Sequence, residues 1–166
     1  MRYIVDSNSF ITPHRGYSPI DVARSLWSKI SALASEHKIY SLDKVKEELY
    51  LHDDELKEWM KAKCQQIFSC RPTMLKSSQN CKRLLHGLIV ILSTLQRPNR
   101  SSSEWIRLDI YLVAFAAVAP EEWAIVSMER PAPRNAGEIK LPDACAKFGV
   151  RCLMLQDMFR EMGESY

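Results

Sequence analysis

A C-x-x-C pair is missing from this chain of 166 residues, which has five cysteines. The odd number argues against a framework of disulfides, and the missing pair argues against a structural zinc site. The cysteines are Cys64, Cys70, Cys81, Cys145 and Cys152. We therefore expect reduced thiols in a cytoplasmic protein.

Long hydrophobic runs are also missing. The longest, residues 84–95 and 110–119, contain or border polar groups and are shorter than the roughly 20 residues that a membrane-spanning helix needs. No apolar segment with a cleavage site follows Arg2, so we expect neither a secretory signal nor a membrane anchor. The chain is 46% hydrophobic and 26% charged. This length and composition are typical of one globular domain, expected to span residues 1–166.

Acidic residues are absent between residues 69 and 103, where six basic residues occur. These are Arg71, Lys76, Lys82, Arg83, Arg97 and Arg100. Residues 42–58, in contrast, hold seven acids against three lysines. Such a separation suits a protein that binds cations at one place and phosphates at another. Two solvated helix faces would give the same pattern, and from charge alone that is the simpler interpretation.

Short apolar segments alternate with helical patterns along the chain. Buried strands are predicted at residues 3–5, 38–40, 123–127 and 150–153. Helices are predicted at residues 21–36, 41–50, 104–119 and 143–148, and a last short helix is predicted to end at 162. Ser41 is the expected N-cap of the second of these. One more helix is predicted to begin at Asp53 or Asp54 and to end at about Phe68. A longer helical insert is expected at about residues 68–103. The proline- and glycine-containing segments 6–20 and 128–138 are predicted to be loops.

This alternation favours an α/β layer protein with a parallel sheet. In such sheets, functional sites lie beyond the carboxyl ends of the strands. Two acids occupy positions of that kind. Asp6 directly follows the first strand, and Glu129 stands two residues after Ser127 at the end of the third.

Two further acids interrupt the apolar pattern of their helices. Asp109 shares a helix face with Trp105, Leu112 and Ala116 in the most hydrophobic helix of the chain. Glu48 falls beside the inward-facing Val45 and Leu49, whereas its neighbour Glu47 points more to the outside.

An ionised carboxylate that is buried without a partner is costly. Each acid has a structural alternative: Asp6 can accept from amides of its own turn, Glu48 can pair with a lysine, and Asp109 can meet an arginine. Together, however, these three and Glu129 can converge above the sheet. Their mutual repulsion would then be relieved by a hard divalent cation with oxygen ligands.

Four stretches carry a family resemblance: Y-I-V-D-S-N at residues 3–8, V-K-E-E-L at 45–49, D-I-Y-L-V-A-F-A at 109–116 and A-I-V-S-M-E at 124–129. In this order, and in strand, helix, helix and strand contexts, they resemble the PIN-domain nucleases, particularly the VapC-type toxins of prokaryotic toxin–antitoxin pairs. The resemblance implies a three-layer α/β/α PIN-like fold with a short central parallel sheet.

The resemblance also implies roles for individual residues. Asp6, Glu48 and Asp109 match the first three metal-binding catalytic acids, and Glu129 matches the fourth. Polar support is implied for Ser7 or Asn8 and for Ser127. The family more often has Thr-x-Asp where this chain has Ser-Met-Glu at 127–129. Asp143 is therefore a rival fourth acid or an outer ligand, although a plain helix cap explains it more simply.

If the resemblance holds, the activity is metal-dependent hydrolysis of RNA phosphodiesters. One or two Mg²⁺ or Mn²⁺ ions would activate water, so that the products carry a 5′-phosphate and a 3′-hydroxyl. The scattered histidines have no assigned role. The nearest candidates for RNA contacts are Arg130 and Arg134, in the loop after Glu129, and further ones are Arg97, Arg100, Arg71 and Lys82.

Two alternatives remain open from the sequence. A phosphotransferase of the haloacid dehalogenase type would need an aspartate at the position of Asn8. The second alternative is a PIN-like module that binds RNA or protein and has a degenerate, inactive acidic site. It stays open because residues 127–129 read Ser-Met-Glu instead of the family's Thr-x-Asp.

As a relative of toxins, the protein is expected to pair with an antitoxin protein and to form homodimers.

Overall fold

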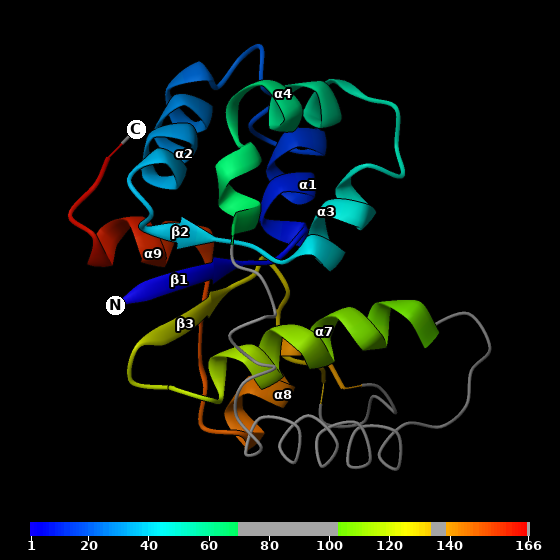
Figure 1. Cartoon of the computed structure of the whole chain (residues 1–166), viewed down its shortest axis with the longest axis vertical. Helices are drawn as coiled ribbons and strands as arrows, with labels where there is room; N and C mark the ends of the chain where they lie inside the picture. Colours follow the sequence, from blue (N-terminus) through cyan, green and yellow to red (C-terminus); the bar gives the residue numbers. More distant parts are fainter. Residues whose placement is uncertain (70–102, 134–138, 166) are drawn as a thin grey trace.

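The computed structural model describes residues 1–69, 103–133 and 139–165. At its centre lies a four-stranded sheet with the strand order β2-β1-β3-β4, in which every neighbouring pair is parallel. The strands are β1 (Arg2–Val5), β2 (Ile39–Tyr40), β3 (Trp123–Val126) and β4 (Arg151–Leu153). Helices lie above and below this sheet in Figure 1. The predicted α/β class, with three layers and a short parallel sheet, is confirmed.

The two central strands are apolar because helices cover both of their faces. All four residues of β3 are buried, and so are Tyr3, Ile4 and Val5 of β1. Parallel strands enclosed in this way read as continuous hydrophobic runs rather than as alternating patterns. Their register pairs Val5 with Val126, so β1 and β3 end side by side. The residues after these strands, Asp6 and Ser127, therefore emerge together.

One face of the sheet is covered by the first four helices and a short 3₁₀ turn. These are α1 (Asn8–Arg15), α2 (Arg24–Ser35), α3 (Asp43–Leu49), α4 (Glu55–Lys63) and η1 (Gln65–Ser69). Their buried side chains include Phe10, Trp27 and Leu56. Trp27 is anchored twice, because its Nε1 donates to the carbonyl oxygen of Ser18 at 2.8 Å and its ring meets that of Trp59 edge to face.

The opposite face carries α7 (Ser103–Ala116) and α8 (Leu141–Lys147), which contact each other and pack on β3 and β4. The last helix, α9 (Leu155–Glu161), follows β4 and lies near α2 in Figure 1. Glu164, just after α9, accepts a hydrogen bond from Lys29 of α2 at 2.6 Å. The C-terminal part of the chain is thereby tied to the N-terminal half.

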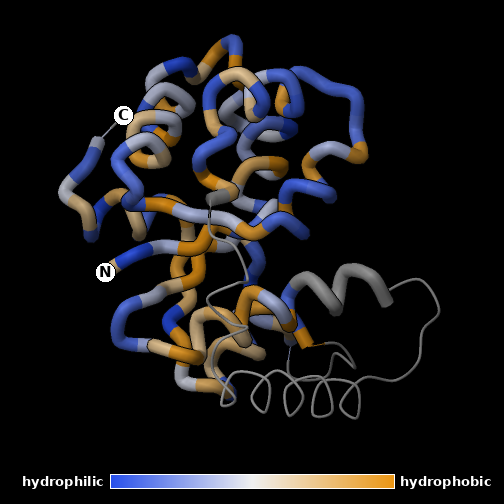
Figure 2. The backbone as a smooth tube through the Cα atoms, in the orientation of Figure 1, coloured by the Kyte–Doolittle hydropathy of each residue, from blue (hydrophilic) through white to orange (hydrophobic). Residues whose placement is uncertain are grey.

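Hydrophobic residues follow the sheet and the inner sides of the helices, as Figure 2 shows by its orange segments. The outer turns of α2 and α4 are largely hydrophilic. No helix in the described ranges is both long and apolar enough to cross a membrane.

The segment after β1 differs from its prediction. Residues 6–20 are predicted to be a loop, whereas Asn8–Arg15 form α1. Pro13 lies near the end of this helix, where it removes one backbone hydrogen bond without preventing the earlier turns. The helix is held by burial of Phe10, and its first turn closes as the amides of Phe10 and Ile11 donate to the carbonyl oxygen of Ser7.

Two helix starts also differ from the sequence interpretation. Ser41 is not the N-cap of α3, because Leu42 occupies that position and the hydroxyl of Ser41 donates to the carbonyl oxygen of Val5 at 2.7 Å. Of the two candidates for the cap of α4, Asp54 is the cap, and its carboxylate accepts from the amide of Lys57. The helix then ends at Lys63 and gives way to η1 instead of continuing to Phe68. Nearly all of the helical insert predicted at 68–103 lies outside the described residues.

Candidate metal centre

Asp6 lies at the carboxyl end of β1, in the centre of the sheet edge. It is 2% exposed. Its Oδ2 accepts a hydrogen bond from the hydroxyl of Ser127 at 3.0 Å, and its amide donates to the carbonyl oxygen of Val126 at 2.9 Å. Burial raises the pKa of Asp6 to about 6; hydrogen bonds from Ser127 and Ser7 oppose this rise and the negative charge of Glu129 adds to it. A buried acid with these partners is held in one orientation.

Glu48 reaches the same region from α3. As the helical pattern predicts, it is buried (8% exposed) beside Val45 and Leu49, while Glu47 is exposed and pairs with Lys44. Burial raises the pKa of Glu48 to about 7, and the charges of Asp6 and Glu129 contribute to the rise. Its Oε2 atom is buried and has no hydrogen-bond partner. An acceptor left in this state is costly, so it marks a position suited to a cation or a donor.

Asp109 comes from α7, on the other side of the sheet from α3. It is half-buried, and Leu112 and Ala116 on the same helix are fully buried; the side chain of Trp105 lies outside the described part. Burial raises the pKa of Asp109 to about 8, and the negative charges of Asp6, Glu129 and Glu48 raise it further. The positive charge of Lys140 acts in the opposite direction. Asp109 therefore lies close enough to all three other acids to be affected by each.

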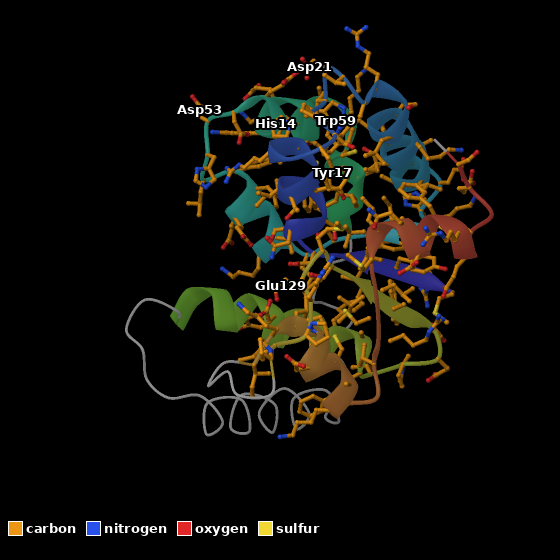
Figure 3. The ribbon with its side chains drawn as sticks, turned by 180° about the vertical axis from the view of Figure 1, so that it is seen from behind. His14, Tyr17, Asp21, Asp53, Trp59 and Glu129 are labelled. Atoms are coloured by element: carbon orange, nitrogen blue, oxygen red, sulfur yellow. The ribbon has the colours of Figure 1, made fainter. Side chains whose placement is uncertain are left out.

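Glu129 is held by both of its carboxylate oxygens. Oε1 accepts from the side-chain amide of Asn8 at 3.1 Å, and Oε2 accepts from the backbone amide of Leu141 at 3.3 Å. Its own amide donates to the hydroxyl of Ser127 at 3.2 Å. In Figure 3, Glu129 lies between α1 and α7. The side chain is thus positioned jointly by α1, by the end of β3 and by the start of α8.

Ser7 connects two of the acids. Its hydroxyl donates to Oδ1 of Asp6 at 3.3 Å, and it lies close enough to the carboxylate of Glu48 to lower the pKa of that group. A hydroxyl has one proton to donate, so Ser7 can satisfy only one of these carboxylates at a time. The other carboxylate must find a proton, a cation or water. The polar support predicted for Ser7, Asn8 and Ser127 thus corresponds to hydrogen bonds with the acids.

Asp143 plays a different part. It is in the first turn of α8, and its Oδ2 accepts from the backbone amides of Ala132 at 2.9 Å and Lys140 at 3.1 Å. These contacts close the start of α8 and fasten the loop that follows Glu129. The capping interpretation therefore describes Asp143 better than that of a rival fourth acid.

The chemistry of the four acids suits a hard divalent cation. All of their donor atoms are carboxylate oxygens, three of the four have raised pKa values, and one oxygen of Glu48 is buried without a partner. The acids do not form a closed cage, however. Within the described ranges, no group of three or more His, Cys, Asp or Glu side chains is arranged so that it could hold a metal ion.

The predicted RNA-contacting arginines are only partly placed. Arg130 is exposed and follows Glu129 directly in the chain. Arg134, Arg97 and Arg100 lie outside the described residues, as do Arg71 and Lys82.

Sequence reasoning missed two contributions from the start of α8. The amide of Leu141 holds Glu129, and the positive charge of Lys140 lowers the pKa of Asp109. No side-chain pattern indicates a backbone donor. Lys140 belongs to no motif either. Only the packing of α8 on α7 brings it near the acids, and the sequence alone does not show that packing.

Comparison with known proteins identifies one family. A family model described as "Domain of unknown function (DUF4411)" matches residues 3–166, which include all four acids and every described strand but the first residue of β1. Searches of curated proteins and of solved structures found no match. Since the family model covers nearly the whole chain, this protein belongs to the DUF4411 family.

Proposed function

We propose that this protein is a Mg²⁺- or Mn²⁺-dependent endoribonuclease with a PIN-like fold. The observation that carries the proposal is that four carboxyl groups from distant parts of the chain lie within electrostatic reach of one another. The charge of Glu129 raises the pKa of Asp6, Glu48 and Asp109 alike. Such a set of acids is costly to the fold unless something positive binds among them. The resemblance of the surrounding motifs to PIN-domain nucleases supports the same activity.

In this proposal Asp6, Glu48, Asp109 and Glu129 would hold the cation. A bound divalent ion supplies Lewis-acid chemistry, which eases deprotonation of water and offsets charge on the phosphate. The hydroxyls of Ser127 and Ser7 orient Asp6, while Asn8 and the amide of Leu141 orient Glu129. Arg130, which is exposed and adjacent to Glu129 in the chain, is suited to bind an RNA phosphate, a contact that positions the strand without reading its bases.

A toxin of a toxin–antitoxin pair is the biological role that the resemblance favours. Under that role, the partners are the RNA substrate, an antitoxin protein that covers the acidic site, and a second copy of the chain. These partners remain proposals.

Ribonuclease activity is tested most directly by paired variants. We expect the purified chain to cleave single-stranded RNA in the presence of Mn²⁺ and to leave a 5′-phosphate. Asp6→Asn should lower the cleavage rate roughly 100-fold or more. In this proposal Asp6 binds the metal ion directly, and loss of a direct ligand costs more than loss of a residue that only orients a ligand. The fold should persist, since an amide is cheaper to bury than a charge.

Glu47 and Glu48 provide a matched control, because they are adjacent acids on one helix and only Glu48 is buried. Glu48→Gln should lower the rate as Asp6→Asn does, and Glu47→Gln should leave it unchanged. Full activity of Asp6→Asn would rule out the proposed site.

A second candidate is a PIN-like binding module with an inactive acidic site. The observation that favours it is the lack of a closed metal-holding group among the described residues. Isothermal calorimetry with Mn²⁺ separates the two proposals. A module of this kind would bind RNA or protein but show neither Mn²⁺ binding nor cleavage.

A further inference from the structure

Two lysines and two aromatic rings meet at the end of α3. The ammonium of Lys46, in α3, lies 5.5 Å from the centre of the ring of Tyr50, which directly follows that helix. The ammonium of Lys61, from α4, lies 5.9 Å from the same centre. Phe68, in η1, meets Tyr50 edge to face and lies 5.7 Å from the Lys46 ammonium. These four residues form a lysine–aromatic cluster, which is part of the surface because Lys61 is exposed and Lys46 and Tyr50 are half-buried.

This lysine–aromatic cluster lies at the carboxyl edge of the sheet, beside the candidate metal centre. The carbonyl oxygen of Ile67, next to the phenylalanine of the cluster, accepts from the amide of Ser41 at 2.7 Å. The hydroxyl of Ser41 donates in turn to the carbonyl oxygen of Val5, the residue before Asp6. Glu48 belongs to α3, the helix that supplies the first lysine of the cluster. The cluster and the acids therefore share one edge of the sheet.

Lys46 differs from the neighbouring lysines in what holds its charge. Lys44 pairs with Glu47 at 2.6 Å, and Lys61 pairs with Glu58 at 2.7 Å. In the described part of the chain no carboxylate forms an ion pair with Lys46, although this segment is rich in acids. Two aromatic rings hold its ammonium instead, and such an attraction leaves the positive charge uncompensated. A cation in this state is suited to an anionic ligand.

We propose that Lys46, Tyr50 and Lys61 form a binding site for the backbone phosphates of a single-stranded nucleic acid. Ammonium groups bind phosphates through charge, and these contacts position a strand without reading its bases. The ring holds both ammoniums in place before a strand arrives, so less side-chain freedom is lost on binding. The inference rests on the proposed function only for the role of the strand as a substrate, which would pass the cluster on its way to the acids.

Binding is measured by fluorescence anisotropy with the full chain and a labelled single-stranded RNA of about 12 nucleotides. EDTA removes divalent ions, so that metal-dependent cleavage does not occur during the measurement. Lys46→Gln and Lys61→Gln should each weaken binding roughly three- to tenfold, and each should lower the slope of log K against log salt by about 0.7, the value for one phosphate of a single strand. A DNA strand of the same sequence should respond in the same way, because the contacts are to phosphates.

Lys44 and Lys63 are matched controls. Each lies two residues from a cluster lysine on the same helix, and therefore on roughly the opposite face of that helix. Lys44→Gln and Lys63→Gln remove the same charge, but they should leave the affinity within about twofold and the salt slope unchanged, because salt screens charges that do not touch the strand.

Tyr50 is a positioning residue in this proposal. Tyr50→Phe keeps the ring and removes a hydroxyl that, among the described residues, is buried without a hydrogen-bond partner, so the affinity should stay within about twofold. Tyr50→Leu removes the ring, and binding should weaken roughly threefold because the ammoniums lose their common support. Lys46→Arg keeps the charge and should keep the wild-type salt slope. Melting temperatures of the variants show whether the fold persists.

The proposal is overturned if the wild-type chain binds neither strand, if the two lysine variants bind like their controls, or if Tyr50→Leu binds like Tyr50→Phe. Cleavage in Mn²⁺ without these effects would reject this site and leave the proposed function standing. The same effects without cleavage would establish the binding site and reject the nuclease.

Discussion

Asp6, Glu48 and Asp109 share a property that few side chains have: their carboxyl groups lose protons at a higher pH in the folded chain than in the unfolded one. Their pKa values are raised to about 6, about 7 and about 8, from the ordinary values of 3.8 for an aspartate and 4.5 for a glutamate. Burial is the largest cause in each case, and mutual repulsion adds to it. Such clusters of perturbed acids are more common at functional sites than elsewhere.

These raised values predict how stability depends on pH when no metal is added. The folded state binds protons more tightly than the unfolded chain, so the resulting stability is fully present below about pH 4 and is lost as the pH rises through 6, 7 and 8. We expect the free energy of unfolding in EDTA to fall by several kcal/mol between pH 5 and pH 8.5. At about 1.4 kcal/mol per pKa unit the three groups taken separately would give roughly 8 kcal/mol, and their coupling makes the actual fall smaller. Urea denaturation at several pH values measures this change.

Asp109→Asn is the informative variant for this prediction. An amide does not ionise, so the variant does not bury a negative charge at this position at pH 8. It should therefore be more stable than the wild type at pH 8, and its free energy of unfolding should depend less on pH. A free energy of unfolding that stays constant or rises between pH 5 and pH 8.5 would contradict the assigned pKa directions.

At the scale of secondary-structure elements, the start of α8 organises one side of the acidic region. The amide of Leu141 and the carboxylate of Asp143 act on neighbouring parts of the same loop. Leu141 donates to Glu129, while Asp143 accepts from Ala132. Glu129 therefore acts electrostatically on the other acids of the site, whereas the carboxylate of Asp143 accepts hydrogen bonds from backbone amides.

Glu129 and Asp143 should consequently respond differently to substitution. Asp143→Ala removes the acceptor of two backbone amides, and we expect it to lower the free energy of unfolding by about 1–3 kcal/mol. Its affinity for Mn²⁺ should stay within about threefold of the wild type. Glu129→Gln should change stability little, because an amide can still accept from Leu141, but should weaken Mn²⁺ binding by roughly tenfold or more. Denaturation and calorimetry on both variants measure these effects, and the opposite pattern would make Asp143 the fourth acid.

At the scale of the whole molecule, the four acids come within electrostatic reach of one another only when the fold is complete. They come from the end of β1, from α3, from α7 and from the loop after β3, which lie on both sides of the sheet. Because no such site exists in the unfolded chain, any ion bound among the acids stabilises the folded state.

Mn²⁺ should therefore raise the melting temperature in a pH-dependent way. At pH 8, a concentration of 100 times Kd contributes about 2.7 kcal/mol, which corresponds to a shift of roughly 5–10 °C for a chain of this size. At pH 5 Asp6, Glu48 and Asp109 are protonated, and the shift should nearly vanish. Thermal unfolding at both pH values measures it. Glu47→Gln should keep the full shift, and equal shifts at pH 5 and pH 8 would mean that the ion binds elsewhere.

The sequence by itself determined the central architecture. The four apolar segments at residues 3–5, 38–40, 123–127 and 150–153 are found as strands with small changes at their ends. They are recognisable because a strand covered on both faces must be apolar throughout. The inward position of Glu48 also followed from helical periodicity, since residues three and four apart share a face.

Only the tertiary structure decided how polar groups are used. Ser41 bonds Val5 instead of capping a helix, and Asn8 and Leu141 hold Glu129 from positions 121 and 12 residues away. The same holds for α1, which forms despite Pro13 because Phe10 is buried. Local patterns report which face of an element is apolar, but they contain no information about which distant donor will meet which acceptor. That choice depends on the packing of all three layers, and it is the packing that brings the acids together.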